Sequence, residues 1–168
     1  MIMKKFIFLV NPISGTGKKQ GIVELIKKEA ATRSIDIEIC DTRADGMYAD
    51  VKQKIISGNV THIGIVGGDG TVNEVASVVA FTGAALAIIP SGSGNGLARE
   101  LGIPLEPAEA FRTALGGVER IIDAGELDGR LFFNIAGIGL DARVAQRFAA
   151  GGLVRRGLLR YLVMTTHE

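Results

Sequence analysis

The chain has 168 residues, of which 47% are hydrophobic and 22% charged, and its formal net charge is +1. This length suits one well-packed domain, or one domain with part of a second. The composition excludes a disordered chain. A net charge near zero gives no bulk attraction to nucleic acid, and 5% aromatic residues without Trp argue against a base-stacking surface. We therefore expect a globular protein with no nucleic-acid partner.

The cysteine count and the longest uncharged run indicate where in the cell the protein lies. Cys40 is the single cysteine, which excludes a disulfide framework and a cysteine-based zinc site and favours a reducing compartment. The segment from Val75 to Ala98 has no charged residue, and roughly 20 such residues could span a bilayer. Because Pro90 and a glycine- and serine-rich loop interrupt it, we interpret it as the core of a soluble, cytoplasmic protein.

The first two thirds of the chain alternate predicted strands with predicted helices. The first strand is a continuous apolar run, as in a parallel sheet buried on both faces, whereas the second alternates apolar and acidic residues. Four strand–loop–helix units in succession predict a doubly wound parallel α/β sheet. The predicted strands cover residues 5–10, 35–40, 61–66 and 84–89, and the predicted helices lie near 22–30, 47–56, 72–79, 96–101 and 107–115.

The pattern changes after Gly116-Gly117. Residues 120–126 and 130–135 are predicted strands joined by a hairpin turn at Asp128-Gly129, and two helical patterns follow near 142–148 and 153–165. Consecutive strands with a tight turn indicate an antiparallel element. We therefore predict one α/β domain over 1–117 and, over 118–168, the start of a second, β-rich domain that this chain does not complete.

The segment from His62 to Val75 predicts a phosphate site. It is a buried strand, then a turn with glycines at 67, 68 and 70, then a helix. Glycines allow a tight turn and leave room for a bulky anion, and the helix would direct its unpaired N–H groups toward that space. The alternative is an ordinary strand-to-helix turn in which Asp69 merely caps the helix.

Two more loops should lie beside this one. They follow the first and fourth predicted strands, at residues 11–19 and 90–96, and the carboxyl ends of parallel strands meet at the edge where ligands bind. The first loop is not a Walker A motif, because Lys19 stands where Ser or Thr is required. It also lacks the third glycine of the dinucleotide fingerprint, where Gln20 stands.

Taken together, the three loops resemble the catalytic-domain motifs of the diacylglycerol kinase/sphingosine kinase family. The resemblance rests on Asn11-Pro12-x-Ser14-Gly15, on Gly67-Gly68-Asp69-Gly70-Thr71-x-Asn73-Glu74, and on Pro90-Ser91-Gly92-Ser93-Gly94-Asn95-Gly96-Leu97-Ala98. That family shares its fold with NAD kinases and phosphofructokinase. The second motif alone would leave NAD kinase open, whereas the flanking loops favour the lipid-kinase branch.

The resemblance implies a set of nucleotide-binding residues. Asn11 and Thr42 would contact the nucleotide, the turn would offer donors to the phosphates, Ser93 would keep a hydroxyl where many members have Thr, and Asn95 would order its loop. Each residue could instead serve ordinary turn and cap chemistry. The implied nucleotide-binding set is Asn11, Thr42, Gly67, Gly68, Asp69, Gly70, Thr71, Asn73, Ser93 and Asn95.

Asp69 is the candidate catalytic residue. A helix N-terminus stabilises the carboxylate form, which makes this side chain a poor base near neutral pH. It can still orient a metal–phosphate complex or accept the substrate proton late. In sphingosine-kinase-like members this position is treated as the acid/base, whereas bacterial members are thought to use a later acidic residue, so the identity of the base stays open.

Three other features have two interpretations each. Asp141 matches a position that contacts the lipid head group in related kinases, or else caps a helix. Asp123, Glu126 and Asp128 could suggest a metal cluster, although alternate strand positions and a turn explain them better. The basic side of the helix predicted at 153–165 could rest on anionic lipid, although a solvated face is commoner.

The resemblance therefore implies an ATP-dependent lipid kinase that transfers the γ-phosphoryl group of ATP to a lipid hydroxyl, with Mg2+ as cofactor and metal ligands unassigned. Its lipid would be of the diacylglycerol or sphingoid-base class, with transient contact at the inner membrane face, and a homodimer is an open expectation. The alternatives are an NAD kinase-like enzyme and a nucleotide-binding fragment without activity of its own.

Overall fold

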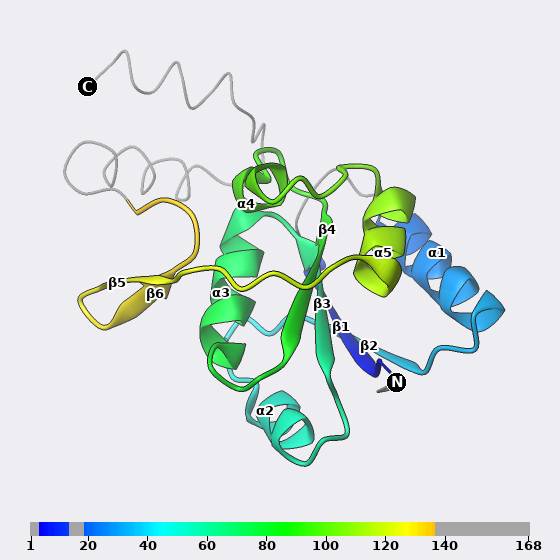
Figure 1. The fold of residues 1–168 in the computed structure, drawn as a ribbon, viewed down its shortest axis with the longest axis horizontal. Coiled ribbons are helices and arrows are strands. Elements are labelled where there is room, and N and C mark those ends of the chain that lie inside the picture. The colour runs from blue at the N-terminus through cyan, green and yellow to red at the C-terminus, as the bar shows by residue number, and fades with distance from the viewer. Residues whose placement is uncertain (1–3, 14–18, 137–168) are drawn as a thin grey trace. The chain divides into compact units, whose positions relative to one another are not determined.

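The computed structural model describes residues 4–13 and 19–136, and the chain divides into two compact units, 1–133 and 134–168. The first unit contains nearly all of the described residues and is drawn in colour in Figure 1. Several predictions lie outside the described residues. These are Ser14 and Gly15 of the first loop, Asp141, and the helices predicted near 142–148 and 153–165.

A parallel sheet of four strands forms the centre of the first unit, in the order β2-β1-β3-β4. Phe6 of β1 pairs with Ile37 of β2 on one side and with His62 of β3 on the other. Strand β2 therefore lies on one side of β1, whereas β3 and then β4 lie on its other side. This is the predicted doubly wound α/β fold. The strands are β1 (Phe6–Val10), β2 (Ile37–Asp41), β3 (His62–Gly67) and β4 (Ala85–Pro90).

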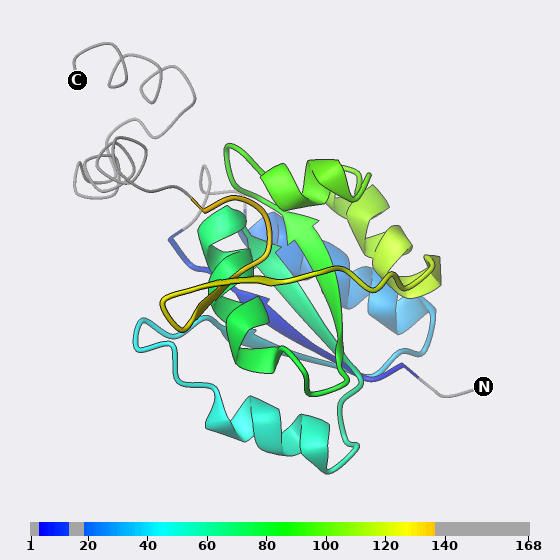
Figure 2. The ribbon, with the colours of Figure 1, turned by 60° about the vertical axis from the view of Figure 1, so that its left-hand side comes forward.

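Helices cover both faces of the sheet (Figures 1 and 2). Each begins near the residue that the sequence predicts, and Pro107 opens the last one, where a missing N–H costs nothing. On one face lie α1 (Lys19–Thr32) and α5 (Pro107–Gly116), and on the other lie α2 (Ala49–Ile56) and α3 (Asp69–Val79), while the short α4 (Gly96–Glu100) follows β4.

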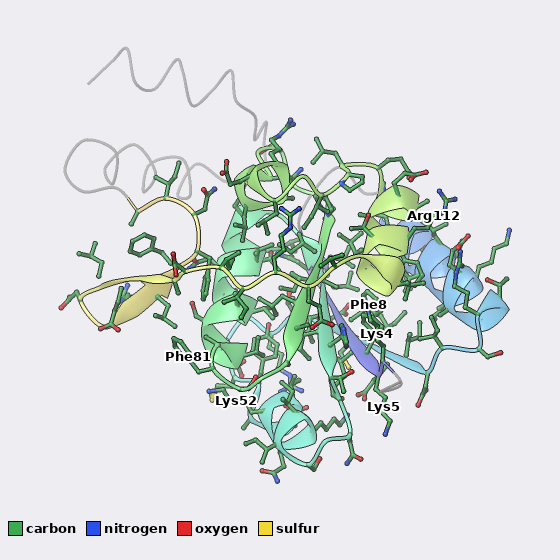
Figure 3. The ribbon with its side chains drawn as sticks, viewed as in Figure 1. Lys4, Lys5, Phe8, Lys52, Phe81 and Arg112 are labelled. Carbon is green, nitrogen blue, oxygen red and sulfur yellow. The ribbon has the colours of Figure 1, made fainter. Side chains whose placement is uncertain are left out.

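Strand β1 shows how the two cores are divided. All five of its residues are buried, with Ile7 and Leu9 in the cluster of α2 and α3 and alternate residues in the cluster of α1 and α5. The ring of Phe8 lies 5.6 Å from that of Phe111, centroid to centroid, between the sheet and α5 (Figure 3). Strand β2 is half exposed, as its alternating acids predict.

The hairpin after α5 is shorter than predicted. It consists of β5 (Gly125–Leu127) and β6 (Arg130–Phe132), joined at Asp128-Gly129, whose φ angles of 50° and 72° suit the predicted tight turn. The prediction of strands over 120–126 and 130–135 is wrong in extent. Residues 120–124 form no ladder and Ile121 is fully exposed, because no strand of the described chain lies beside them. An apolar alternating pattern indicates a strand only where a partner is available.

The uncharged run from Val75 to Ala98 does not form one helix. It is divided among α3, β4 and the start of α4. Within the part of the chain that the structure describes, no helix is long and apolar enough to cross a membrane.

Candidate functional site

Four loops leave the sheet at its carboxyl edge, and backbone hydrogen bonds continue from the strands into them. The N–H of Asn11 donates to Val66 O (3.0 Å), that of Thr42 to Val10 O (2.8 Å), and that of Ser91 to Gly67 O (2.9 Å). These bonds fix the first residue of each loop relative to the strand beside it. The loops predicted to meet at this edge therefore do meet there.

The loops after β3 and β4 touch through glycine backbone. A Cβ atom added to Gly68 would lie 3.1 Å from the Cα of Gly92, and one added to Gly92 would lie 2.5 Å from the Cα of Gly68. Real Cβ atoms do not approach backbone as closely as 2.5 Å, so the second position requires glycine. This approach brings the N-terminus of α3 directly against the loop of residues 91–95.

Asn95 holds the loop after β4. Its Oδ1 accepts from the N–H of Gly92 (3.0 Å) and its Nδ2 donates to the carbonyl of Gly92 (2.9 Å). The residue is buried and left-handed, with φ 53°, a conformation that asparagine adopts more readily than most residues. Ser93, by contrast, is exposed at the tip of the loop.

Asp69 joins α3 to α4. The residue before it, Gly68, is the N-cap of α3 and makes no side-chain cap bond, so Asp69 is not the cap of its own helix. Its Oδ1 accepts from the N–H of Leu97 at 3.4 Å. The carboxylate is otherwise exposed, beside Gly94, where an added Cβ would lie 2.9 Å from Oδ2.

Thr71 joins α3 to the loop after β1. Its Oγ1 accepts from Nδ2 of Asn11 at 2.7 Å, and Oδ1 of Asn11 in turn accepts from the N–H of Ile13 at 2.9 Å. Thr71 is 6% exposed. Two residues from separate motifs, predicted to share one site, are therefore hydrogen-bonded to each other.

Glu74 joins α3 to the loop after β2. Its Oε1 accepts from the hydroxyl of Tyr48 at 3.2 Å, and the same hydroxyl accepts from the N–H of Arg43 at 3.0 Å. Burial, together with the charge of Glu74, raises the pKa of Tyr48, so this phenol stays protonated and remains a donor. Tyr48 belongs to no motif, so nothing in the sequence predicts this contact, and Glu74 is only the last residue of the second motif.

The outer part of this loop carries an ion pair. Arg43 makes two hydrogen bonds to the carboxylate of Asp50, at 2.6 and 2.7 Å, and it lowers the pKa of Asp50 to about 2. Both side chains are exposed, and a pair in water adds little stability. The arginine also lies over the ring of Tyr48, 5.7 Å from its centroid, so it covers the buried phenol.

Asn73 does not join the other predicted residues. Its Nδ2 donates to the carbonyl of Leu131 in β6 at 3.4 Å, which ties α3 to the hairpin. Ser77, one turn later, lies against the same carbonyl. Gly67 is buried, Gly70 is exposed in the first turn of α3, and Asp141 lies outside the described residues.

The described residues contain no group of three or more His, Cys, Asp or Glu side chains arranged to hold a metal ion. Magnesium in kinase sites is commonly held by one or two carboxylates together with the substrate phosphates, so it does not need such a group. Asp69, exposed at the N-terminus of α3, is a suitable carboxylate for that arrangement.

Comparison with known proteins shows which family contains these loops. Residues 5–127 match the model of the diacylglycerol kinase catalytic domain, and this range includes all three glycine loops. The chain belongs to the diacylglycerol kinase catalytic domain family. The family resemblance drawn from the motifs is thereby confirmed, and the family is one of kinases.

Two relatives and one solved structure show how far the likeness extends. The chain is 38% identical over 132 residues to a "Probable lipid kinase YegS-like" of Pseudomonas aeruginosa, covering 76% of this chain and 43% of that protein. It is 36% identical over 142 residues to the diacylglycerol kinase of Bacillus subtilis, covering 82% and 46%. A crystal structure of a diacylglycerol kinase from Bacillus anthracis superposes with a TM-score of 0.67 at 30% identity, covering 79% of this chain and 50% of that one. The chain thus spans about half the length of these family members.

Proposed function

We propose that this chain is the nucleotide-binding part of an ATP-dependent lipid kinase, which transfers the γ-phosphoryl group of ATP to a lipid hydroxyl. The observation that carries the proposal is that one helix, α3, links the glycine turn to the other three loops. Asp69 accepts a hydrogen bond from Leu97, just after the loop that follows β4. Thr71 accepts one from Asn11 in the loop after β1, and Glu74 accepts one from Tyr48, just after the loop that follows β2. A site assembled in this way is rigid before the ligand arrives, as phosphoryl transfer requires.

The residues at this edge suit ATP. The turn at Gly67, Gly68 and Gly70 and the N-terminus of α3 would offer N–H groups to the phosphates, and the contact of Gly68 with Gly92 leaves no side chain between the two loops. Asn11, Thr42, Thr71, Ser93 and Asn95 would complete the nucleotide site. When bound, ATP with magnesium supplies the phosphoryl group and the neutralisation of its charge.

Asp69 would orient the phosphates and their metal ion. Its carboxylate is exposed beside the glycine turn, and a hydrogen bond from Leu97 fixes one of its oxygens. We assign it this orienting role alone, and the identity of the general base stays open.

The lipid side of the site would belong to residues 118–168, as the start of a substrate-side domain in which Asp141 contacts the head group. The relative from B. subtilis is named a diacylglycerol kinase, which supports a glycerolipid as the acceptor. We also propose that the protein contacts a membrane surface transiently and that it forms a homodimer.

The test is a transfer assay with ATP labelled in its γ-phosphate, magnesium, and vesicles that contain diacylglycerol or a sphingoid base. Labelled lipid is the expected product, and labelled NADP from added NAD would support the NAD kinase alternative instead. Because the chain spans about half of its relatives, saturable ATP binding without transfer would identify it as a nucleotide-binding module. Failure to bind ATP would overturn the proposal.

A further inference from the structure

A pair of side chains outside the predicted site, Tyr48 and Glu74, connects α3 to the loop of residues 42–47. Glu74 lies one turn after Thr71 on α3 and is exposed, whereas Tyr48 is 2% exposed at the N-cap of α2. The phenol hydroxyl donates to Glu74 Oε1 at 3.2 Å and accepts from the N–H of Arg43 at 3.0 Å. One hydroxyl thus ties the backbone of the loop to the helix of the glycine turn.

The loop also has hydrogen bonds of its own. The N–H of Gly46 donates to Arg43 O at 3.1 Å, and that of Met47 donates to Oδ1 of Asp45 at 2.9 Å, so the loop is a pair of tight turns. Gly46 adopts φ 65°, and a Cβ added there would lie 4.0 Å from Oε1 of Glu74. The loop therefore folds back against the carboxylate that anchors it.

The hydrogen bonds of the Tyr48 hydroxyl restrain the loop next to Thr42, the residue that we propose contacts the nucleotide. Thr42 has its own N–H held by Val10 O at 2.8 Å, and the next N–H, that of Arg43, is held by Tyr48. The first bond ties Thr42 to the sheet, and the second ties the next residue to α3 through Tyr48 and Glu74. Loss of the phenol hydroxyl would release the second of these restraints and leave the first intact.

We propose that Tyr48 and Glu74 are positioning residues that hold the loop of residues 42–47, and with it Thr42, in register with the phosphate-binding end of α3. This inference rests on the proposed nucleotide site. Neither residue needs to touch the reacting atoms. The phenol hydroxyl links the helix to the loop by one hydrogen bond on each side, and the carboxylate of Glu74 keeps the hydroxyl oriented as a donor.

The test measures the dissociation constant of ATP with magnesium for the full chain and its variants, by calorimetry well below the melting temperature of each. Tyr48→Phe keeps the buried ring and removes only the hydroxyl. We expect it to bind ATP about five- to tenfold more weakly, the scale of one ordinary hydrogen bond. Glu74→Ala should weaken binding equally, and Glu74→Gln, which keeps an acceptor oxygen, should restore affinity to within about twofold.

Two further measurements separate positioning from general loss of structure. In the double variant Tyr48→Phe/Glu74→Ala, affinity should fall no further than in either single variant, because both remove one link. Thr61→Val is the matched control, since it removes a half-buried hydroxyl at the opposite edge of the sheet, where Thr61 accepts from Lys5 N. It should bind ATP as the wild type does.

The outcomes are distinct. Wild-type affinity in Tyr48→Phe, or additive losses in the double variant, would overturn the positioning role while leaving the proposed function intact. Equal weakening by Thr61→Val would also overturn it, because the effect would then follow from lost stability. Absence of ATP binding in the wild type would overturn the proposed function and this inference with it.

Discussion

Short neutral side chains hold the loops of the carboxyl edge together. Asn11 donates to Thr71, and Asn95 closes its own loop on Gly92. Asp69 and Glu74 act there as hydrogen-bond acceptors, and among the described residues neither belongs to an ion pair. The N-terminus of α3 at this edge is where we propose that the phosphates bind.

Asp69→Asn tests the role of the carboxylate. Asparagine keeps the shape and an oxygen for the N–H of Leu97, so the fold should be unchanged. We expect phosphoryl transfer, or ATP turnover where no lipid is supplied, to fall at least about 100-fold, as when a group that stabilises a transition state is removed. The gain in ATP affinity that magnesium gives should also shrink. Normal turnover together with an unchanged effect of magnesium would refute the assigned role.

Gly92→Ala tests the contact between two loops. The added Cβ would lie 2.5 Å from the Cα of Gly68, and backbone cannot yield as a flexible side chain does. We expect a loss of about 1–3 kcal/mol in the free energy of unfolding, measured by urea titration, and weaker ATP binding. Gly21→Ala is the control. It lies within α1 with nothing within 4 Å of the added atom, so it should stabilise the chain slightly.

Among the elements, α3 does the most to organise the molecule. Its inward side supplies Val72, Val75 and Val79 to one core, and its N-terminal half supplies the acceptors for three loops. Its third contact is with the hairpin, through Asn73 and Ser77. The helix thereby connects the carboxyl edge of the sheet with the hairpin, which belongs to the segment that we propose for the lipid side.

Strand β3 carries a buried histidine at the other edge of the sheet. His62 lies 3.1 Å from Oε1 of Glu119 and 2.7 Å from Oγ1 of Thr61, and it packs on Phe6. Burial lowers the pKa of His62, and Lys4 lowers it further, while Glu119 opposes the shift only in part because its side chain is 64% exposed. In the unfolded chain the imidazole returns to its ordinary range, near 6.5.

The sign of the pH dependence follows from that shift. Below its ordinary pKa the imidazole binds a proton more readily in the unfolded chain, so its contribution to stability is complete above about pH 6.5 and declines as the pH falls. Between pH 7.5 and 5.5 the melting temperature should fall more for the wild type than for His62→Asn, measured by circular dichroism. Parallel curves for the two proteins would show that His62 is not the group responsible.

On the scale of the whole molecule, the elements that sequence reasoning placed well are those fixed by local pattern. The predicted strand at 84–89 is a continuous apolar run and the one at 61–66 is apolar from Ile63 on, and they need only the sheet itself to become β4 and β3. The three motifs identified the family because glycine and asparagine are required by loop geometry at positions such as Gly92 and Asn95. The expected nucleotide-binding roles of these residues remain proposals.

What sequence reasoning missed depends on contacts between distant residues. Tyr48 and Glu74 are 26 positions apart, and nothing local signals that one donates to the other. The strand predicted over 120–126 forms only at its end, in β5, for a related reason. Ile121 is fully exposed, because pairing is decided by neighbours that the local pattern does not contain.

We propose that the carboxyl edge of this sheet binds ATP, and amide NMR of the 15N-labelled chain during titration with ATP and magnesium would detect that binding residue by residue. We expect saturable shifts at Asn11, Thr42, Gly68 and Gly92. Lys5 and Thr61, at the opposite edge, should remain unchanged. Saturable shifts confined to any other face, or no shifts at millimolar ATP, would contradict it.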